Sequence, residues 1–244
     1  MIGMVLAAGA GRRLGDDTRD LPKTLLPVDG DRTILDVALG NLKTAGLEKA
    51  VVVTGFAANR IEERQDELAK RHDIEVELCF NPKAEEWNNA YSLWMARDHF
   101  AEGVLLVNGD TVHPASVEQA LLDARGAGEI VIALDDVKQL GQEEMKVHLT
   151  EEGLLDKINK SLYAPTAQGE YIGLTLINPA SAEKLADALE AVWKRDPQLY
   201  YEDGFQEYAD RGGRIGVAAI GAVEWVEVDD HADLARAREV ACRC

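Results

Sequence analysis

The chain has 244 residues, of which 44 are Asp or Glu and 26 are Lys or Arg, so its formal net charge is −18. This acidic excess argues against a protein that binds duplex nucleic acid or an anionic membrane surface, because both need a basic face. With 46% hydrophobic and 29% charged residues, the composition is that of a globular protein long enough for one domain with a full core.

The three cysteines, Cys79, Cys242 and Cys244, offer neither a disulfide framework nor the spacing of a zinc site. The apolar N-terminal residues lack a basic leader, and no window approaches the roughly 20 apolar residues that span a bilayer. We therefore expect a soluble cytoplasmic protein with an inert Cys-Arg-Cys tail. The sequence leaves open whether the chain forms a homodimer.

Short apolar runs alternate with helical patterns along the chain and predict a single α/β domain over residues 1–244, wound around a parallel sheet. Strands are predicted at 2–6, 49–54, 75–80, 103–108, 129–134, 145–150, 171–177 and 224–228. Helices are predicted after Thr33, over 57–71, over 181–194 and over 231–240, the last capped by Asp230. Breaks at Gly141, Gly153 and Pro165 predict that residues 135–178 form a β-rich insertion over one edge of the sheet.

The first strand leads into a glycine-rich loop with Gly9 and Gly11. These glycines permit a tight turn whose backbone N–H groups can face a phosphate chain. Leu14 stands where a dinucleotide-binding loop would have its third glycine, and no Lys-Ser/Thr pair completes a P-loop. Lys23 follows between Pro22 and an apolar run.

The run Leu-Ala-Ala-Gly-x-Gly-x-Arg, followed by Pro-Lys-x-Leu, resembles the signature of nucleotidyltransferases that activate sugars and alcohols with nucleoside triphosphates. The resemblance implies a Rossmann-like nucleotidyltransferase fold with a mixed, mostly parallel sheet and helices on both faces. It implies that Arg13 holds the triphosphate and that Lys23 neutralises charge at the α-phosphate. The implied nucleotide contacts of the loop are Leu6, Ala7, Ala8, Gly9, Ala10, Gly11 and Arg12. For Arg12, a simple surface position is an equal alternative.

Acidic residues follow two of the predicted strands, Asp110 after 103–108 and Asp229 after 224–228. Two carboxylates at neighbouring strand ends, together with substrate phosphate, suit Mg²⁺. In the family that the chain resembles, these strand-end aspartates are the metal ligands. We therefore predict Mg²⁺ on Asp110 and Asp229, with Glu227 as a weaker third ligand because it shares the face of Asp229.

The segment 81–94, Asn-Pro followed by Asn-Asn-x-Tyr-Ser-Leu-Trp, carries the subtype information. It resembles the phosphocholine, inositol-phosphate and phosphonate cytidylyltransferases more than the sugar-nucleotide enzymes. The resemblance implies that Asn89 and Ser92 contact the base and ribose of CTP. The alternative is an Asn N-cap followed by an ordinary amphipathic helix.

Scarce cations in the insertion and aromatic residues after it point to the acceptor. An anionic phosphate or phosphonate needs cationic partners, and Lys146 and Lys160 are the candidates, with a surface or paired role as the alternative. Tyr200, Glu202 and Asp203 combine aromatic rings with carboxylates, which suits an amine or trimethylammonium group. Core packing explains the same tyrosine equally well.

Together these features predict transfer of CMP from CTP to a phosphate or phosphonate acceptor, such as phosphocholine or 2-aminoethylphosphonate, with release of pyrophosphate and no covalent enzyme intermediate. One alternative is a sugar-phosphate or molybdopterin nucleotidyltransferase that uses another triphosphate. A second, of another class, is a regulatory nucleotide-binding protein without turnover. The joint presence of Arg13, Lys23, Asp110 and Asp229 argues against the second.

Overall fold

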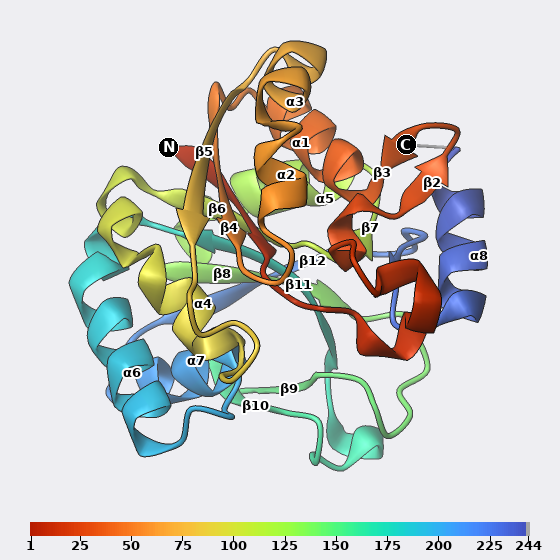
Figure 1. Cartoon of the computed structure of the whole chain (residues 1–244). Coiled ribbons are helices and arrows are strands. Elements are labelled where there is room, and N and C mark those ends of the chain that lie inside the picture. The colour runs from red at the N-terminus through yellow and green to blue at the C-terminus, as the bar shows by residue number, and fades with distance from the viewer. Residues whose placement is uncertain (243–244) are drawn as a thin grey trace.

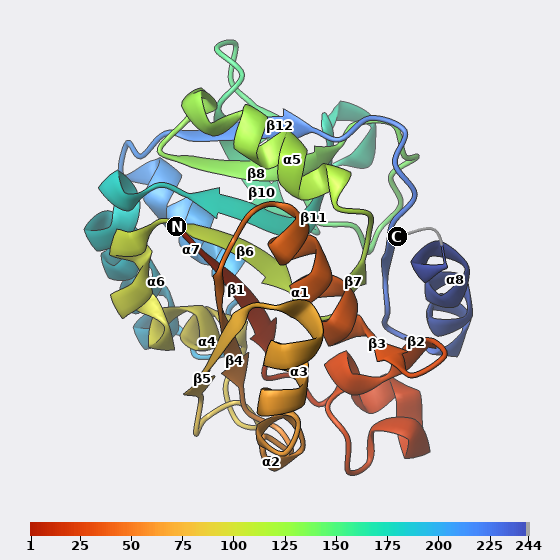
Figure 2. The ribbon, with the colours of Figure 1, turned by 90° about the horizontal axis from the view of Figure 1, so that it is seen from above.

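The computed structural model describes residues 1–242, which form a central nine-stranded sheet with helices on both faces (Figures 1 and 2). Cys244 lies outside the described residues. The main path of the sheet is β10-β9-β11-β6-β1-β4-β5, with β8 paired to β11 and β12 paired to β8. Its strands are β1 (Ile2–Ala7), β4 (Lys49–Thr54), β5 (Glu75–Phe80), β6 (Val104–Asn108), β8 (Ile130–Asp135), β9 (Lys146–Leu149), β10 (Leu155–Asn159), β11 (Gly169–Ile177) and β12 (Ile215–Ala219). Two small two-stranded sheets pair β2 (Pro27–Asp29) with β3 (Arg32–Thr33) and β7 (Thr111–Val112) with β13 (Val226–Glu227).

The sheet is mixed, as the sequence predicts. Strands β1, β4, β5 and β6 run parallel to one another, whereas β11 is antiparallel to β6, β8 and β9. The register sets Leu6 opposite Asn108 and Ala7 opposite Thr54, so the carboxyl ends of the parallel strands meet at one edge. In sheets of this kind the crevice beyond that edge is where ligands bind.

Helices cover both faces of the sheet (Figure 2). Strand β1 shows why both faces are apolar, since Met4 packs into the core under α4, α6 and α7 while Val5 packs into the core under α1, α3 and α5. A smaller third core joins α8 to α1 and β2. The helices are α1 (Ile34–Thr44), α2 (Asn59–Glu62), α3 (Gln65–His72), α4 (Asn89–Met95), α5 (Ser116–Asp123), α6 (Ala182–Arg195), α7 (Tyr201–Asp210) and α8 (His231–Ala241).

Most predicted elements are present, and the differences are as follows. The predicted helix over 57–71 is divided into α2 and α3, and the strand over 224–228 shrinks to β13, which pairs with β7 outside the main sheet. Strands β10 and β12 and helix α7 were not predicted. The insertion is also smaller than 135–178, because β11 is a fully buried central strand and only β9 and β10 extend the edge. Asp230 caps α8, as predicted.

None of the helices in residues 1–242 combines the length and the apolar character that a membrane span requires.

Candidate active site

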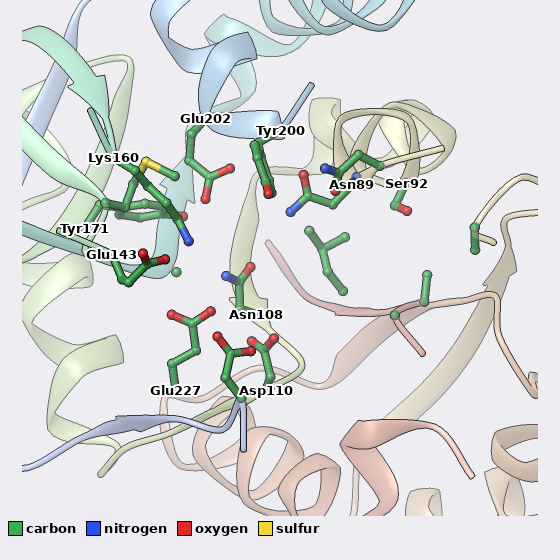
Figure 3. Close-up of a pocket in the computed structure, with 18 of the residues that line it drawn as sticks. Asn89, Ser92, Asn108, Asp110, Glu143, Lys160, Tyr171, Tyr200, Glu202 and Glu227 are labelled. Carbon is green, nitrogen blue, oxygen red and sulfur yellow. Dashed lines mark hydrogen bonds between the residues drawn. The ribbon is translucent and has the colours of Figure 1, made fainter. Parts of the chain in front are cut away.

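A pocket of about 290 Å³ opens at the carboxyl edge of the parallel strands (Figure 3). It gathers predicted residues that lie far apart in the sequence. Those that line it are Leu6, Ala8, Gly9, Arg13, Asn89, Ser92, Asp110, Lys160, Tyr200, Glu202, Glu227 and Asp229. Ala7, Ala10, Gly11 and Arg12 lie outside the lining, so the glycine loop faces the pocket mainly through Gly9 and its neighbours.

The glycine loop packs directly on Lys23. Gly11 has φ +58°, and a Cβ placed on it would lie 2.9 Å from the Cβ of Lys23. A residue with a side chain would therefore be strained by its backbone and would collide with the lysine. The hydroxyl of Thr18 donates to the Gly11 carbonyl at 2.8 Å. This loop thus fixes where the Lys23 side chain begins.

Lys23 lies between the two predicted strand-end aspartates. Its Nζ is 2.8 Å from Asp110 Oδ2 and 3.1 Å from Asp229 Oδ1. Arg13 Nη1 donates to Asp229 Oδ2 at 2.9 Å. Burial alone would lower the pKa of Lys23, but the two carboxylates outweigh it and raise that pKa. The ammonium therefore keeps its charge at all physiological pH values.

Local backbone contacts bring the two strand ends together. Glu227 in β13 pairs with Thr111 in β7, and the Val228 N–H donates to the Asp110 carbonyl at 2.9 Å. Gly109 is needed beside Asp110, because a Cβ there would lie 2.4 Å from the Leu6 carbonyl oxygen at the end of β1. The short β7–β13 pair, rather than the main sheet, sets the distance between the acids.

Three carboxylates form a group that fits a divalent cation. Oxygen atoms of Asp110, Glu227 and Asp229 lie within 4.8 Å of one another. Asp110 Oδ1 is buried and finds no hydrogen-bond partner within residues 1–242, which is costly for a carboxylate unless a ligand binds it. Desolvation and the charges of Asp110 and Asp229 raise the pKa of Glu227 to about 7. Burial would raise the pKa of Asp229 too, but Lys23 and Arg13 lower it. This hard oxygen set suits Mg²⁺.

At one end of the pocket, Asn89 and Ser92 lie on the first turns of α4. Asn81 Nδ2 donates to Ser92 Oγ at 2.9 Å, and both residues are buried. The Tyr201 N–H donates to Asn89 Oδ1 at 2.9 Å. Asn88 caps α4 through its side chain, as the N-cap alternative predicted. Asn89 and Ser92 of the same helix nevertheless line the pocket, so the two alternatives do not exclude each other. The hydroxyl proton of Ser92 and the NH₂ group of Asn89 remain as donors.

The opposite end of the pocket holds a lone lysine and a buried glutamate. Lys160 points into the pocket beside Glu143 (Figure 3), and its ammonium forms no ion pair within residues 1–242. Glu202 is 7% exposed, and its Oε2 has no hydrogen-bond partner in the described chain. Burial and the nearby charge of Glu227 raise the pKa of Glu202 to about 8. Tyr200 and the buried Tyr171 line the same end.

Two predicted acceptor residues take other roles. Lys146 is 1% exposed, and its ammonium donates to the carbonyls of Gln142, Glu144 and Lys160 at 3.0, 3.1 and 2.5 Å. These hydrogen bonds link β9 to the segment before it and to the end of β10, and Lys146 does not line the pocket. Asp203 accepts from the Tyr200 N–H at 2.8 Å and so caps α7. The prediction that they contact the acceptor is therefore not supported by their positions.

Sequence reasoning did not single out several lining residues. Asn108 is the last residue of β6, two positions before Asp110, and its position at a strand end could have predicted that it lines the pocket. Tyr171 and Glu143 fall in the predicted insertion but carried no individual role. Trp87 lines the base end and stacks on Trp193, with ring centroids 5.6 Å apart. That contact joins α6 to the segment before α4 and has no sequence signature.

Comparison with known proteins identifies the family to which the chain belongs. Residues 3–195 match the MobA-like NTP transferase domain, and the chain belongs to that family. The chain is therefore a member of a nucleotidyltransferase family, and cytidylyltransferases are among its homologues.

Particular relatives agree with this class. A CMP-5'-(3-aminopropyl)phosphonate synthase of Streptomyces rubellomurinus is 30% identical over 94% of this chain and 37% of that protein. A choline-phosphate cytidylyltransferase of Streptococcus pneumoniae is 29% identical over 43% of each chain. The matched regions thus span less than half of these relatives' own lengths. The inositol-1-phosphate CTP transferase from T. maritima has the same fold, with a TM-score of 0.82, 24% identity and coverage of 99% of this chain and 94% of that one.

Proposed function

We propose that the chain transfers CMP from CTP to an oxygen of a phosphate- or phosphonate-bearing acceptor and releases pyrophosphate. One observation carries the proposal. The pocket is lined by Asp110 and Asp229, whose carboxylates pair with Lys23 just behind the lining. Ser92, a donor suited to a base, and Lys160, whose ammonium has no ion-pair partner within residues 1–242, line the same pocket. A triphosphate and an anionic acceptor would need this set of groups.

The donors at the base end favour cytosine. Because Asn81 occupies a lone pair of Ser92 Oγ, the Ser92 hydroxyl is best placed to donate. Asn89 offers its NH₂ group, since its oxygen already accepts from Tyr201. The O2 and N3 atoms of cytosine are both acceptors, whereas N3 of uracil carries a hydrogen. Two donors at this end would therefore select CTP over UTP.

The reaction forms one bond and breaks one. An anionic oxygen of the acceptor attacks the α-phosphorus of CTP, and the bond from that phosphorus to the oxygen bridging to the β-phosphate breaks, so pyrophosphate leaves with the electron pair. Lys23 and Arg13 would stabilise the charge that develops on the phosphoryl oxygens. Mg²⁺ held by Asp110, Glu227 and Asp229 would add positive charge there when bound. No proton must be removed from an acceptor that is already anionic.

The far end of the pocket supports an acceptor that also carries a cation. Glu202 is a buried carboxylate with one oxygen that lacks a hydrogen-bond partner within residues 1–242, and it lines the pocket together with Tyr171 and Tyr200. Such a group is stabilised by a bound ammonium through charge and through contact with the aromatic faces. Lys160 would meet the anionic end of the same acceptor. The aminopropylphosphonate named in the Streptomyces relative has both groups.

Pyrophosphate release tests the proposal. Wild-type protein is incubated with Mg²⁺ and each of the four nucleoside triphosphates, with 3-aminopropylphosphonate, 2-aminoethylphosphonate, phosphocholine, inositol phosphate and glucose 1-phosphate as separate acceptors. We expect the highest turnover with CTP and a zwitterionic acceptor. Equal use of all four triphosphates would contradict the choice of CTP, and activity confined to glucose 1-phosphate would favour the sugar-nucleotide alternative.

A further inference from the structure

Helix α7 begins at a residue that contacts two pocket-lining side chains. Tyr201 is fully buried. Its backbone N–H donates to Asn89 Oδ1 at the base end, and its hydroxyl donates to Asn108 Oδ1 at 2.9 Å. Both asparagines line the pocket. Because Tyr201 occupies the oxygen of each amide, the two NH₂ groups are left to face the substrates.

A chain of buried hydroxyl groups fixes the direction of the Tyr201 hydrogen bond. The Tyr171 oxygen lies 3.0 Å from that of Tyr201, and Thr175 Oγ1 lies 2.7 Å from that of Tyr171. The Asn108 oxygen can only accept, so Tyr201 donates to it and accepts from Tyr171, which in turn accepts from Thr175. Burial and the charge of Glu202 raise the pKa of both tyrosines, so both remain protonated.

A bulge in β11 makes room for the NH₂ group of Asn108. The register of β11 against β8 shifts between Tyr171 and Thr175, and Gly173 within the bulge has φ +85°. A Cβ on Gly173 would lie 2.5 Å from Asn108 Nδ2. Any other residue there would displace the amide. Gly173 therefore leaves space for the NH₂ group of Asn108, and the Tyr201 hydroxyl holds the oxygen of the same amide. Together they fix the orientation of the Asn108 side chain.

We propose that the NH₂ group of Asn108 donates to an oxygen of the acceptor's phosphorus group, and that Tyr201 is the residue that positions it. This inference rests on the proposed function. Asn108 lies between Glu202 and the acids Asp110 and Glu227, and Lys160 faces it across the pocket (Figure 3). A tetrahedral anion at that point would meet the Lys160 ammonium on one side and the Asn108 amide on the other.

The variant Tyr201→Phe isolates the hydroxyl, because it keeps the ring and the backbone N–H that bonds Asn89. We expect the KM for the acceptor to rise about tenfold, the change that one hydrogen bond of about 1.4 kcal/mol produces, while the KM for CTP stays within about twofold. Tyr208→Phe is the matched control, since Tyr208 is equally buried on α7 but its hydroxyl bonds Glu129 outside the pocket. That variant leaves both KM values unchanged.

Two variants of Asn108 show whether Tyr201 acts through it. In an Asn108→Ala background, Tyr201→Phe should add little to the acceptor KM, whereas independent effects would multiply. Asn108→Asp keeps the oxygen that accepts from Tyr201 and replaces the NH₂ group by a negative oxygen. We expect it to raise the acceptor KM by more than about 100-fold, which is about twice the free energy of the Tyr201→Phe effect. Multiplying effects, or equal rises in both KM values for Tyr201→Phe, would overturn the inference.

Failure of the proposed function itself has a separate signature, namely no turnover of any acceptor by the wild-type protein. Calorimetric titration with inorganic phosphate then decides the inference without turnover. Weaker phosphate binding by Tyr201→Phe and Asn108→Asp than by the wild type supports it. Equal affinity in all three proteins overturns it.

Discussion

Replacing Glu202 by glutamine removes a charge that the fold tolerates poorly. The carboxylate is 7% exposed, one of its oxygens has no hydrogen-bond partner within residues 1–242, and burial raises its pKa to about 8. Glutamine has nearly the same shape and no charge. The substitution should therefore stabilise the free protein and, at the same time, weaken binding of a cationic acceptor.

The pH dependence of stability follows from the direction of the pKa shift. The folded protein holds the Glu202 proton more tightly than the unfolded chain does. The contribution of Glu202 to wild-type stability therefore falls as pH rises from about 4.5 to about 8, and it does not change with pH below 4.5 or above 8. The slope is at most about 1.4 kcal/mol per pH unit, so about 5 kcal/mol is the ceiling. Water reaching an open pocket reduces this, and we expect Glu202→Gln to gain about 1–3 kcal/mol over the wild type between pH 4.5 and 8.5.

Urea unfolding at pH 4.5 and pH 8.5 measures this difference directly. Glu85→Gln is the control, since it makes the same charge change at an exposed position. In turnover, Glu202→Gln should raise the KM for 3-aminopropylphosphonate at least about tenfold and leave the KM for CTP unchanged. A stability difference between wild type and Glu202→Gln that does not grow with pH would refute the reasoning about the buried charge.

Three further predictions concern other parts of the molecule. Lys23→Ala should lower kcat about 10²- to 10³-fold in the pyrophosphate assay, because it removes charge from the reacting phosphate, and a loss below about threefold would contradict that role. Ser92→Ala should reduce the preference for CTP over UTP about tenfold, as measured by kcat/KM ratios. Although burial opposes it, hydrogen bonds from His72 and Thr33 hold the pKa of the fully buried Asp36 well below its usual range. Asp36→Asn should therefore cost about 2–4 kcal/mol in urea unfolding at pH 7, and the difference from wild type should narrow as pH falls below about 4, where wild-type Asp36 loses its advantage.

Much of the fold and part of the candidate site are predictable from local pattern. Strands β1, β4 and β6 are largely apolar runs bounded by breaks, and residues such as Asp110 follow shortly after a strand ends. Because the carboxyl ends of parallel strands meet at one edge of the sheet, residues that follow different strands can be predicted to lie close together even when the packing is unknown. This rule predicted that Asp110 and Asp229 lie close together, whereas Lys23 was predicted from the resemblance of its Pro-Lys-x-Leu segment to the nucleotidyltransferase signature.

Helix α7 shows what local pattern does not reveal. Tyr201, Phe205 and Tyr208 have helical spacing, but aromatic residues and Gly204 are weak helix formers, so the helix depends on tertiary packing. A Cβ on Gly204 would lie 2.5 Å from Leu189 of α6, so the glycine allows the two helices to approach closely. The role of Lys146 is equally hidden, because only the three-dimensional structure shows that three carbonyls hold its ammonium.

The central claim is tested most directly by ³¹P NMR of a mixture of the wild-type protein, Mg²⁺, CTP and 3-aminopropylphosphonate. The account predicts that the CTP signals are replaced by those of pyrophosphate and by a pair of mutually coupled signals, one from a phosphate and one from a phosphonate joined through oxygen. Unchanged CTP, or its conversion to CDP and phosphate without a coupled phosphonate signal, would contradict the account.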